Sequence, residues 1–131
     1  MPRVVHFEIP VNDIDRSIAF YQKVFGWTFK KFDGPELYYL VSTGPKDQPG
    51  IDGGLLKKRD PRQPMVNTIQ VENVDATISW VEQNGGKCCL PKMAIPGVGW
   101  LKTVSFCISM RFEKILYLTK VCSESHPSWL K

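Results

Sequence analysis

The amino-acid sequence predicts an α+β protein of 131 residues, built from two βαβββ units. Two observations lead to this prediction. Strand-like and helix-like patterns follow one another in the same order over residues 3–58 and 65–120. Within them, residues 11–26 align without a gap with residues 71–86, at an offset of sixty residues, which favours an internal duplication. Positions that shape an element match at this offset: Val11 with Val71, Ile14 with Val74, Asp15 with Asp75, Ile18 with Ile78, and Gly26 with Gly86.

The first unit opens with an alternating strand at residues 4–9. Successive side chains of a strand point to opposite faces of the sheet. His6 and Glu8 should therefore share one face, and Phe7 and Ile9 the other. A histidine and a carboxylate side by side are residues that could transfer a proton, which makes them weak catalytic candidates.

A helix follows this strand. Asn12 or Asp13 can cap its first turn, and Gly26 is suited to end it, since glycine readily adopts a left-handed conformation. Apolar residues at helical spacing should pack against the sheet: Ile14, Ile18, Tyr21 and Phe25. Three more strands are expected at residues 27–32, 37–42 and 51–57, separated by turns rich in glycine and proline.

The second unit follows a polar linker at residues 59–64. Its expected elements are a strand at 66–71, a helix at 74–84, a strand at 87–90, a loop at 91–99 and strands at 101–108 and 114–119. Val74, Ile78 and Val81 should form the inward face of the helix. We expect one domain over residues 1–120, with a loose or partner-bound tail at 121–131.

The composition limits the classes of function. Hydrophobic residues make up 43% and charged residues 23% of the chain, which is ordinary for a globular protein. No stretch approaches the roughly 18 apolar residues that span a bilayer, and no apolar signal segment opens the chain. The basic run at residues 57–59 is interrupted by Asp60 and lacks interleaved aromatics. We therefore expect a cytoplasmic protein that binds neither membrane nor nucleic acid.

Several motifs resemble a known family. They are HFEIP at residues 6–10, DRSIAFY at 15–21, FGW at 25–27, GIDGG at 50–54 and the helix and glycines at 74–86. In these residues the chain resembles the glyoxalase/bleomycin-resistance/dioxygenase group, the vicinal oxygen chelate superfamily. The stretch PKMAIPGVGW at 91–100 resembles a loop of one small bacterial and archaeal branch. The resemblance covers residues 3–100 and marks the fold more specifically than the reaction.

The resemblance implies a curved mixed sheet around a cavity. Family members that do chemistry hold one divalent metal there (zinc, nickel, manganese or iron), with His and Glu ligands from the first and last strands of each half. His6 falls on the first ligand position. Its counterpart sixty residues later is Val66, which cannot bind a metal. The strand at 53–57 offers only Asp52 at its edge, and its own counterpart offers Glu113 at its margin. We therefore expect an eroded metal site and no cofactor.

The leading hypothesis is a metal-free domain that binds a small apolar or aromatic ligand. Its lining is expected to include His6, Glu8, Trp27, Tyr39 and Trp100. Tyr38 and Tyr39 are consecutive, so only one of them can face inward. For each aromatic residue the alternative is ordinary packing in the core, and for His6 the alternative to a metal ligand is a hydrogen-bonded lining residue.

Two other hypotheses stay open. One is a divalent-metal-dependent lyase, isomerase or dioxygenase that uses His6. The other is a dimeric accessory module whose apolar face binds a protein partner. Under each hypothesis the chain is expected to form a homodimer. The chain departs from the family after Trp100, because no glycine follows Gly99 and the expected turn is missing. Residues 101–131 therefore either form the last strands of the family fold or are a frameshifted tail.

Overall fold

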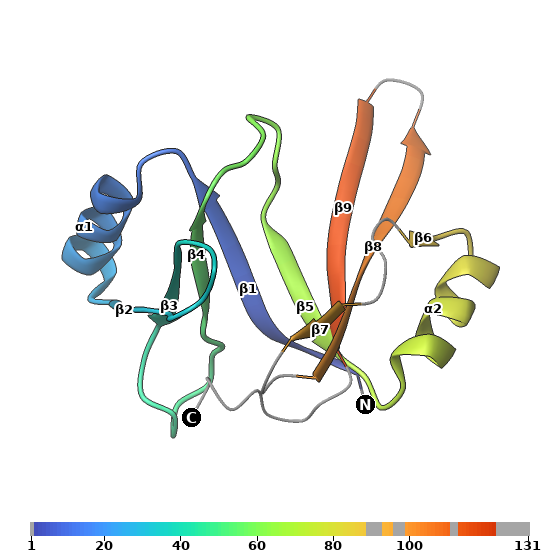
Figure 1. The fold of residues 1–131 in the computed structure, drawn as a ribbon, viewed down its shortest axis with the longest axis horizontal. Coiled ribbons are helices and arrows are strands. Elements are labelled where there is room, and N and C mark those ends of the chain that lie inside the picture. Colours follow the sequence, from blue (N-terminus) through green and yellow to red (C-terminus); the bar gives the residue numbers. More distant parts are fainter. Residues whose placement is uncertain (1, 89–92, 96–98, 111–112, 123–131) are drawn as a thin grey trace. The chain divides into compact units, whose positions relative to one another are not determined.

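The computed structural model describes residues 2–88, 93–95, 99–110 and 113–122, and the side chains of residues 2–88. The chain divides into two compact units. One is His6–Met65, and the other joins Val66–Lys131 with Met1–Val5. Each unit contains one helix and several strands, as the ribbon in Figure 1 shows. The α+β class predicted from the sequence is therefore confirmed.

The first unit has the order βαβββ. Its strands pair in the order β2-β3-β4-β1, with β1 and β4 parallel and the other neighbours antiparallel. The three strands predicted after the helix are present, each slightly shorter than predicted. The elements are β1 (Arg3–Val11), α1 (Ile14–Phe25), β2 (Thr28–Lys31), β3 (Tyr38–Ser42) and β4 (Gly53–Lys57).

Helix α1 covers one face of this sheet, which we call the α1 face. Leu55 of β4 is 0% exposed and Val41 of β3 is 2% exposed, and both pack with Ile14 of α1. Partly buried hydrophobic residues complete the cluster: Phe7, Val11, Ile18, Tyr21, Trp27, Phe29 and Tyr39. The core of the unit thus lies between α1 and the sheet, and the opposite face of the sheet is free of this helix.

The ends of α1 follow the sequence signals. The Asp13 carboxylate accepts a hydrogen bond from the backbone N–H of Arg16 at 3.0 Å, which satisfies a donor that has no partner inside the helix. Gly26 ends the helix with a φ of 70°. The predicted apolar stripe is buried only in part, because Phe25 is 57% exposed. Its ring contacts the rings of Tyr21 and Trp27 at the rim of the core.

The second unit begins with a strand and a helix that repeat this pattern. Asn73 accepts a hydrogen bond from the backbone N–H of Ala76 at 2.9 Å, sixty residues after the equivalent cap at Asp13. Two of the three residues predicted to face inward, Val74 and Ile78, are buried. They pack with Val71 and with partly buried Ile69, Val81 and Cys88.

The strands of the second unit pair in the order β5-β9-β8-β6, with β7 paired to β8. Two predictions were wrong here. The loop expected at 91–99 contains β7, because these residues form an antiparallel pair with the start of β8. Strand β9 also extends two residues into the tail expected at 121–131, and residues 123–131 lie outside the described part. The elements are β5 (Val66–Gln70), α2 (Val74–Gln83), β6 (Lys87–Cys88), β7 (Met93–Ile95), β8 (Gly99–Met110) and β9 (Glu113–Cys122).

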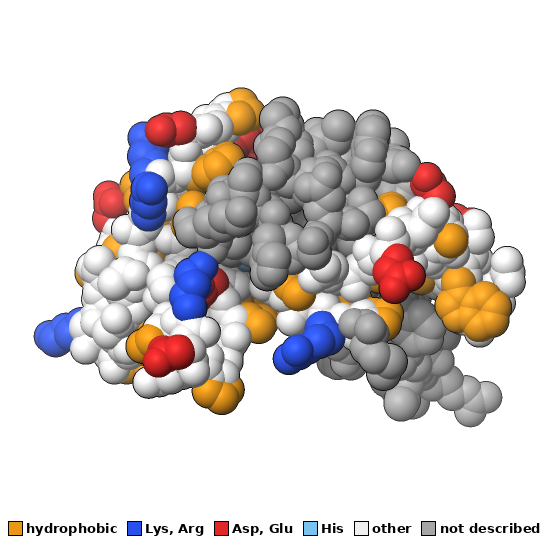
Figure 2. All heavy atoms as spheres, turned by 90° about the horizontal axis from the view of Figure 1, so that it is seen from below, with side chains coloured by type: hydrophobic (Ala, Val, Ile, Leu, Met, Phe, Trp, Pro, Cys, Tyr) orange, Lys and Arg blue, Asp and Glu red, His pale blue; other side chains and the backbone are white. Residues whose placement is uncertain are grey.

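The surface of the described residues mixes apolar and charged side chains. Figure 2 shows one face of the molecule, on which hydrophobic side chains are scattered among charged and other polar ones. The large exposed hydrophobic residues on the helices are Phe20, Val24 and Phe25 of α1 and Trp80 of α2. Within the described ranges, no helix is long and apolar enough to cross a membrane.

The position of Leu55 leads to a first prediction. Its side chain is fully buried in the α1 face, so Leu55→Ala removes buried methyl groups and leaves a cavity. We expect the free energy of unfolding to fall by about 2–5 kcal/mol, measured by equilibrium urea denaturation. The matched control is Leu37→Ala, since Leu37 is 47% exposed, and its effect should stay within about 0.5 kcal/mol. Equal losses in the two variants would contradict the described core.

Candidate functional site

The face of the first sheet opposite α1 carries His6 and Glu8, and we call it the His6 face. Strand β1 places both residues there, because Phe7 between them packs in the α1 face. His6 is 4% exposed and is one of two buried polar residues among the described side chains, the other being Thr68. Strands β4 and β3 continue this face, since Glu8 pairs with Gly54 of β4 and Gly54 pairs with Leu40 of β3. The shared face that the alternation predicted for His6 and Glu8 is present.

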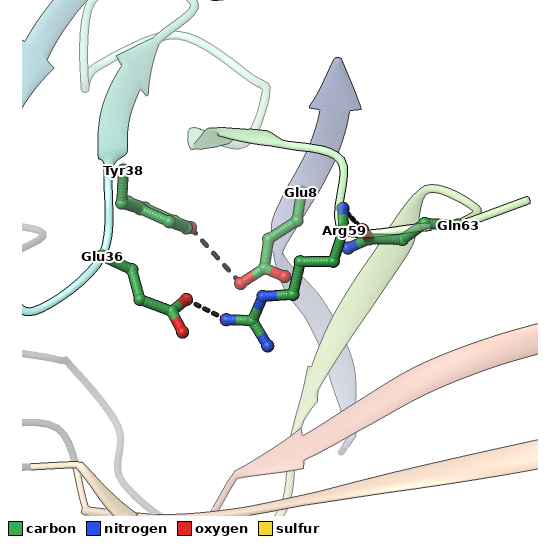
Figure 3. A network of polar contacts seen from close by, with 5 residues as sticks. All are labelled: Glu8, Glu36, Tyr38, Arg59 and Gln63. Atoms are coloured by element: carbon green, nitrogen blue, oxygen red, sulfur yellow. Dashed lines mark hydrogen bonds and ion pairs between the residues drawn. The ribbon is translucent and has the colours of Figure 1, made fainter. Parts of the chain in front are cut away.

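Tyr38 joins this pair from β3. Its hydroxyl oxygen lies 2.7 Å from Nε2 of His6, and it donates a hydrogen bond to Oε1 of Glu8 at 3.4 Å. Figure 3 shows the phenol of Tyr38 pointing toward the carboxylate of Glu8. The two rings of His6 and Tyr38 are nearly parallel, at 14°. The three side chains therefore form one polar cluster centred on the phenol.

The donor and acceptor roles in this cluster follow from the single proton of the phenol. A phenol has one proton, so when Tyr38 donates to Glu8 its oxygen can only accept from His6. His6 then carries its proton on Nε2, and the chain of donors runs from His6 through Tyr38 to Glu8. Burial, the negative charge of Glu8 and the hydrogen bond to Glu8 raise the pKa of Tyr38 above its ordinary value. The phenol consequently keeps its proton at neutral pH and acts as a donor.

An ion pair lies beyond the end of the β3–β4 ladder, close in sequence to Tyr38. The guanidinium of Arg59 pairs with the carboxylate of Glu36, and the backbone N–H of Arg59 donates to Oε1 of Gln63 at 2.9 Å. Figure 3 shows Arg59 pointing toward Glu36. Both side chains are more than 60% exposed. Water screens such a pair, which makes it a weak contributor to stability.

Two of the aromatic residues predicted to line the site lie elsewhere. Trp27 and Tyr39 both pack in the α1 face. Tyr39 is paired with fully buried Leu55, whereas Tyr38 is paired with Leu56 on the His6 face. Between the two consecutive tyrosines, it is therefore Tyr38 and not Tyr39 that meets His6 and Glu8. Trp100 lies in β8 of the second unit, and its side chain is outside the described part.

The sequence contained a signal for Tyr38. The stretch Gly53-Gly54 leaves β4 without a side chain on either face at two consecutive positions. A residue of a neighbouring strand can fill the space that a glycine leaves. Choosing between Tyr38 and Tyr39 nevertheless requires the register of β3 on β4, which the sequence pattern alone does not provide.

Among the described side chains, the donors that the resemblance assigns to a divalent metal are engaged in hydrogen bonds. Nε2 of His6 is engaged by the Tyr38 hydroxyl, and Glu8 accepts from the same hydroxyl. Asp52, the candidate at the edge of β4, instead accepts a hydrogen bond from the backbone N–H of Thr43 at 2.8 Å. Within residues 2–88 and the other described segments, no three His, Cys, Asp or Glu side chains group around a common point.

The sixty-residue counterparts of the His6 pair lie on β5 of the second unit. They are Val66 and Thr68, and both are buried. An aliphatic side chain binds no cation, and a threonine hydroxyl is a poor ligand for zinc, which prefers Cys, His and carboxylate groups. Glu113 is the first residue of β9, where only the backbone is described.

Comparison with known proteins relates the chain to one group of proteins. Residues 3–44 match the family described as bleomycin resistance protein-like N-terminal. A glyoxylase-like domain-containing protein of Didymella fabae is 34% identical over 84 residues, which cover 61% of this chain and 66% of that protein. The chain thus spans about two thirds of the length of this relative.

Solved structures share the fold. A member of the glyoxalase/bleomycin resistance protein/dioxygenase superfamily from Vibrio splendidus 12B01 superposes with a TM-score of 0.60 at 18% identity, over 93% of this chain and 98% of the other. Methylmalonyl-CoA epimerase from Mycobacterium tuberculosis gives a TM-score of 0.62 at 12% identity, over 92% and 88%. At these identities the likeness concerns the fold. Together with the matched family and the relative in Didymella fabae, it shows that the chain belongs to the glyoxalase/bleomycin resistance/dioxygenase superfamily.

Proposed function

We propose that this chain is a small-molecule-binding domain that holds its ligand on the His6 face by hydrogen bonds, without a metal ion. The contact between the Tyr38 hydroxyl and Nε2 of His6 is the observation that carries the proposal. A metal ion bound through that nitrogen would need its lone pair. Here the nitrogen is a partner of a phenol whose proton is retained at neutral pH.

In the proposed site, hydrogen bonds orient the ligand, in place of coordination to a metal ion. Tyr38 and Glu8 present a neutral hydroxyl and a carboxylate on a partly buried surface. Polar groups of this kind orient a ligand, whereas the surrounding apolar surface supplies most of the affinity. Leu40 and Leu56 are both half-buried and belong to the same face by their register. The ligand we propose therefore has a flat apolar or aromatic body and one polar group.

The proposed lining differs from the predicted lining in two respects. Tyr38 takes the place of Tyr39, and the contribution of Trp27 is to the core that supports β1 and not to the ligand. The ring of Trp27 stacks on Tyr21 at 5.0 Å and contacts Phe7, the residue between His6 and Glu8. Trp27 thus helps to hold the strand that carries the polar pair.

A ligand screen tests the binding proposal. Small aromatic and 2-oxo compounds should raise the melting temperature of the wild-type protein, and the Kd of each hit is then measured by titration calorimetry. We expect Tyr38→Phe to weaken a hit about tenfold, or about 1.4 kcal/mol, because the hydroxyl that orients His6 and Glu8 is lost. Tyr39→Phe is the matched control and should bind as the wild type does. Hits that bind Tyr38→Phe and His6→Ala as well as the wild type would rule out this face.

A metal titration tests the metal-free part of the proposal. Wild-type protein and His6→Ala are dialysed against zinc or nickel, and bound metal is counted per chain. We expect no difference between the two, because Nε2 of His6 is already engaged by Tyr38. His126→Gln serves as the control, since His126 is the other histidine of the sequence. One equivalent of metal that is lost only in His6→Ala would instead support a metal-dependent lyase, isomerase or dioxygenase.

A further inference from the structure

Position 54 is where β4 would place a side chain on the His6 face. Gly54 pairs with Glu8 of β1 on one side and with Leu40 of β3 on the other. Paired residues of neighbouring strands direct their side chains to the same face. A side chain at this position would therefore stand beside Glu8, within the polar cluster. The residue is a glycine, and the space is left to its neighbours.

The phenol of Tyr38 occupies this space. A Cβ atom added to Gly54 would lie 1.8 Å from the hydroxyl oxygen of Tyr38 and 2.1 Å from its Cζ atom. These distances are far below van der Waals contact. Tyr38 could give way only by rotating its ring, which would withdraw the hydroxyl from Nε2 of His6.

Backbone conformation does not account for the glycine. Among the described residues, the glycines with positive φ are Gly26, Gly50 and Gly85. Gly54 is not among them, so its backbone is open to residues with a side chain. A glycine at position 54 is therefore explained by the space that it leaves on the His6 face.

Gly53, the preceding residue, lies against Phe7 and not against Tyr38. A Cβ atom at Gly53 would lie 2.4 Å from the ring of Phe7 and 2.5 Å from its carbonyl oxygen. Phe7 belongs to the α1 face. Of two consecutive glycines in one strand, one therefore makes room for the core and the other for the polar cluster.

We infer that Gly54 is a positioning residue, which acts through Tyr38 so that strand β3, in place of β4, supplies the polar group that faces His6 and Glu8. This gives the ligand a phenol hydroxyl at the position where a β4 side chain would otherwise stand. The relevance of Gly54 to ligand binding rests on the function proposed above. Its effect on the position of Tyr38 can be measured without any ligand.

The experiment observes the hydrogen-bonded proton between His6 and Tyr38. Proton and nitrogen NMR of the imidazole is recorded in a His126→Gln background, which leaves His6 as the single histidine of the sequence. We expect Gly54→Ala to abolish the downfield signal of this proton, as Tyr38→Phe does. In the Tyr38→Ala background, adding Gly54→Ala should cause no further change in the His6 signals, because the clashing ring is already gone.

Gly53→Ala is the matched control for a general loss of stability. It should lower the melting temperature and keep the downfield signal, because its clash is with the ring and the carbonyl oxygen of Phe7 and not with Tyr38. A downfield signal that persists in Gly54→Ala, or one that disappears equally in Gly53→Ala, would overturn the inference.

A second measurement covers the case in which Gly54→Ala does not fold. The double variant Gly54→Ala/Tyr38→Ala should then recover folding, since the ring that blocks Ala at position 54 has been removed. Failure of the double variant to fold where Tyr38→Ala alone does fold would also overturn the inference. Absence of any ligand in the screen would contradict the proposed function while leaving these outcomes informative.

Discussion

The contact between the Tyr38 hydroxyl and the His6 imidazole is the interaction on which the site depends. A buried imidazole loses its water, and this loss is costly unless a protein group replaces it. Tyr38 supplies that group at 2.7 Å and donates its own hydrogen bond to Glu8. A cluster of this kind stabilises one arrangement of three strands, because each member is held by another. The same contact gives His6, which the family resemblance assigns to the first ligand position, a partner other than a metal.

The elements of the fold could largely be predicted from the sequence, because they depend on local patterns. Alternation set the two faces of β1, helical spacing set the inner side of α2, and Asp13 marks where α1 begins. Prediction fails for an element that forms only by pairing with a neighbouring strand. The short strand β7 forms by pairing with β8, and a pattern of three residues is too short to predict it.

The site could be predicted only in part. The face shared by His6 and Glu8 follows from a period of two, but the third member follows from register. A shift of one residue in the pairing of β3 with β4 would have brought Tyr39 to this face in place of Tyr38. Family resemblance does not help at this step, since it fixes the scaffold and leaves the chemistry to individual side chains. Trp27 illustrates the same limit, because an aromatic residue near a site serves equally well in the core.

The most direct test of the central contact is the titration of the Tyr38 hydroxyl itself, followed through the 13C signal of its Cζ atom. An ordinary tyrosine loses its proton near pH 10. Burial and the neighbouring Glu8 raise the pKa of Tyr38, so its signal should stay that of the neutral phenol as the pH passes 10, for as long as the protein remains folded. A Tyr38 signal that titrates at the ordinary pH in folded protein would contradict the account, because the phenol would then be in water and not between His6 and Glu8.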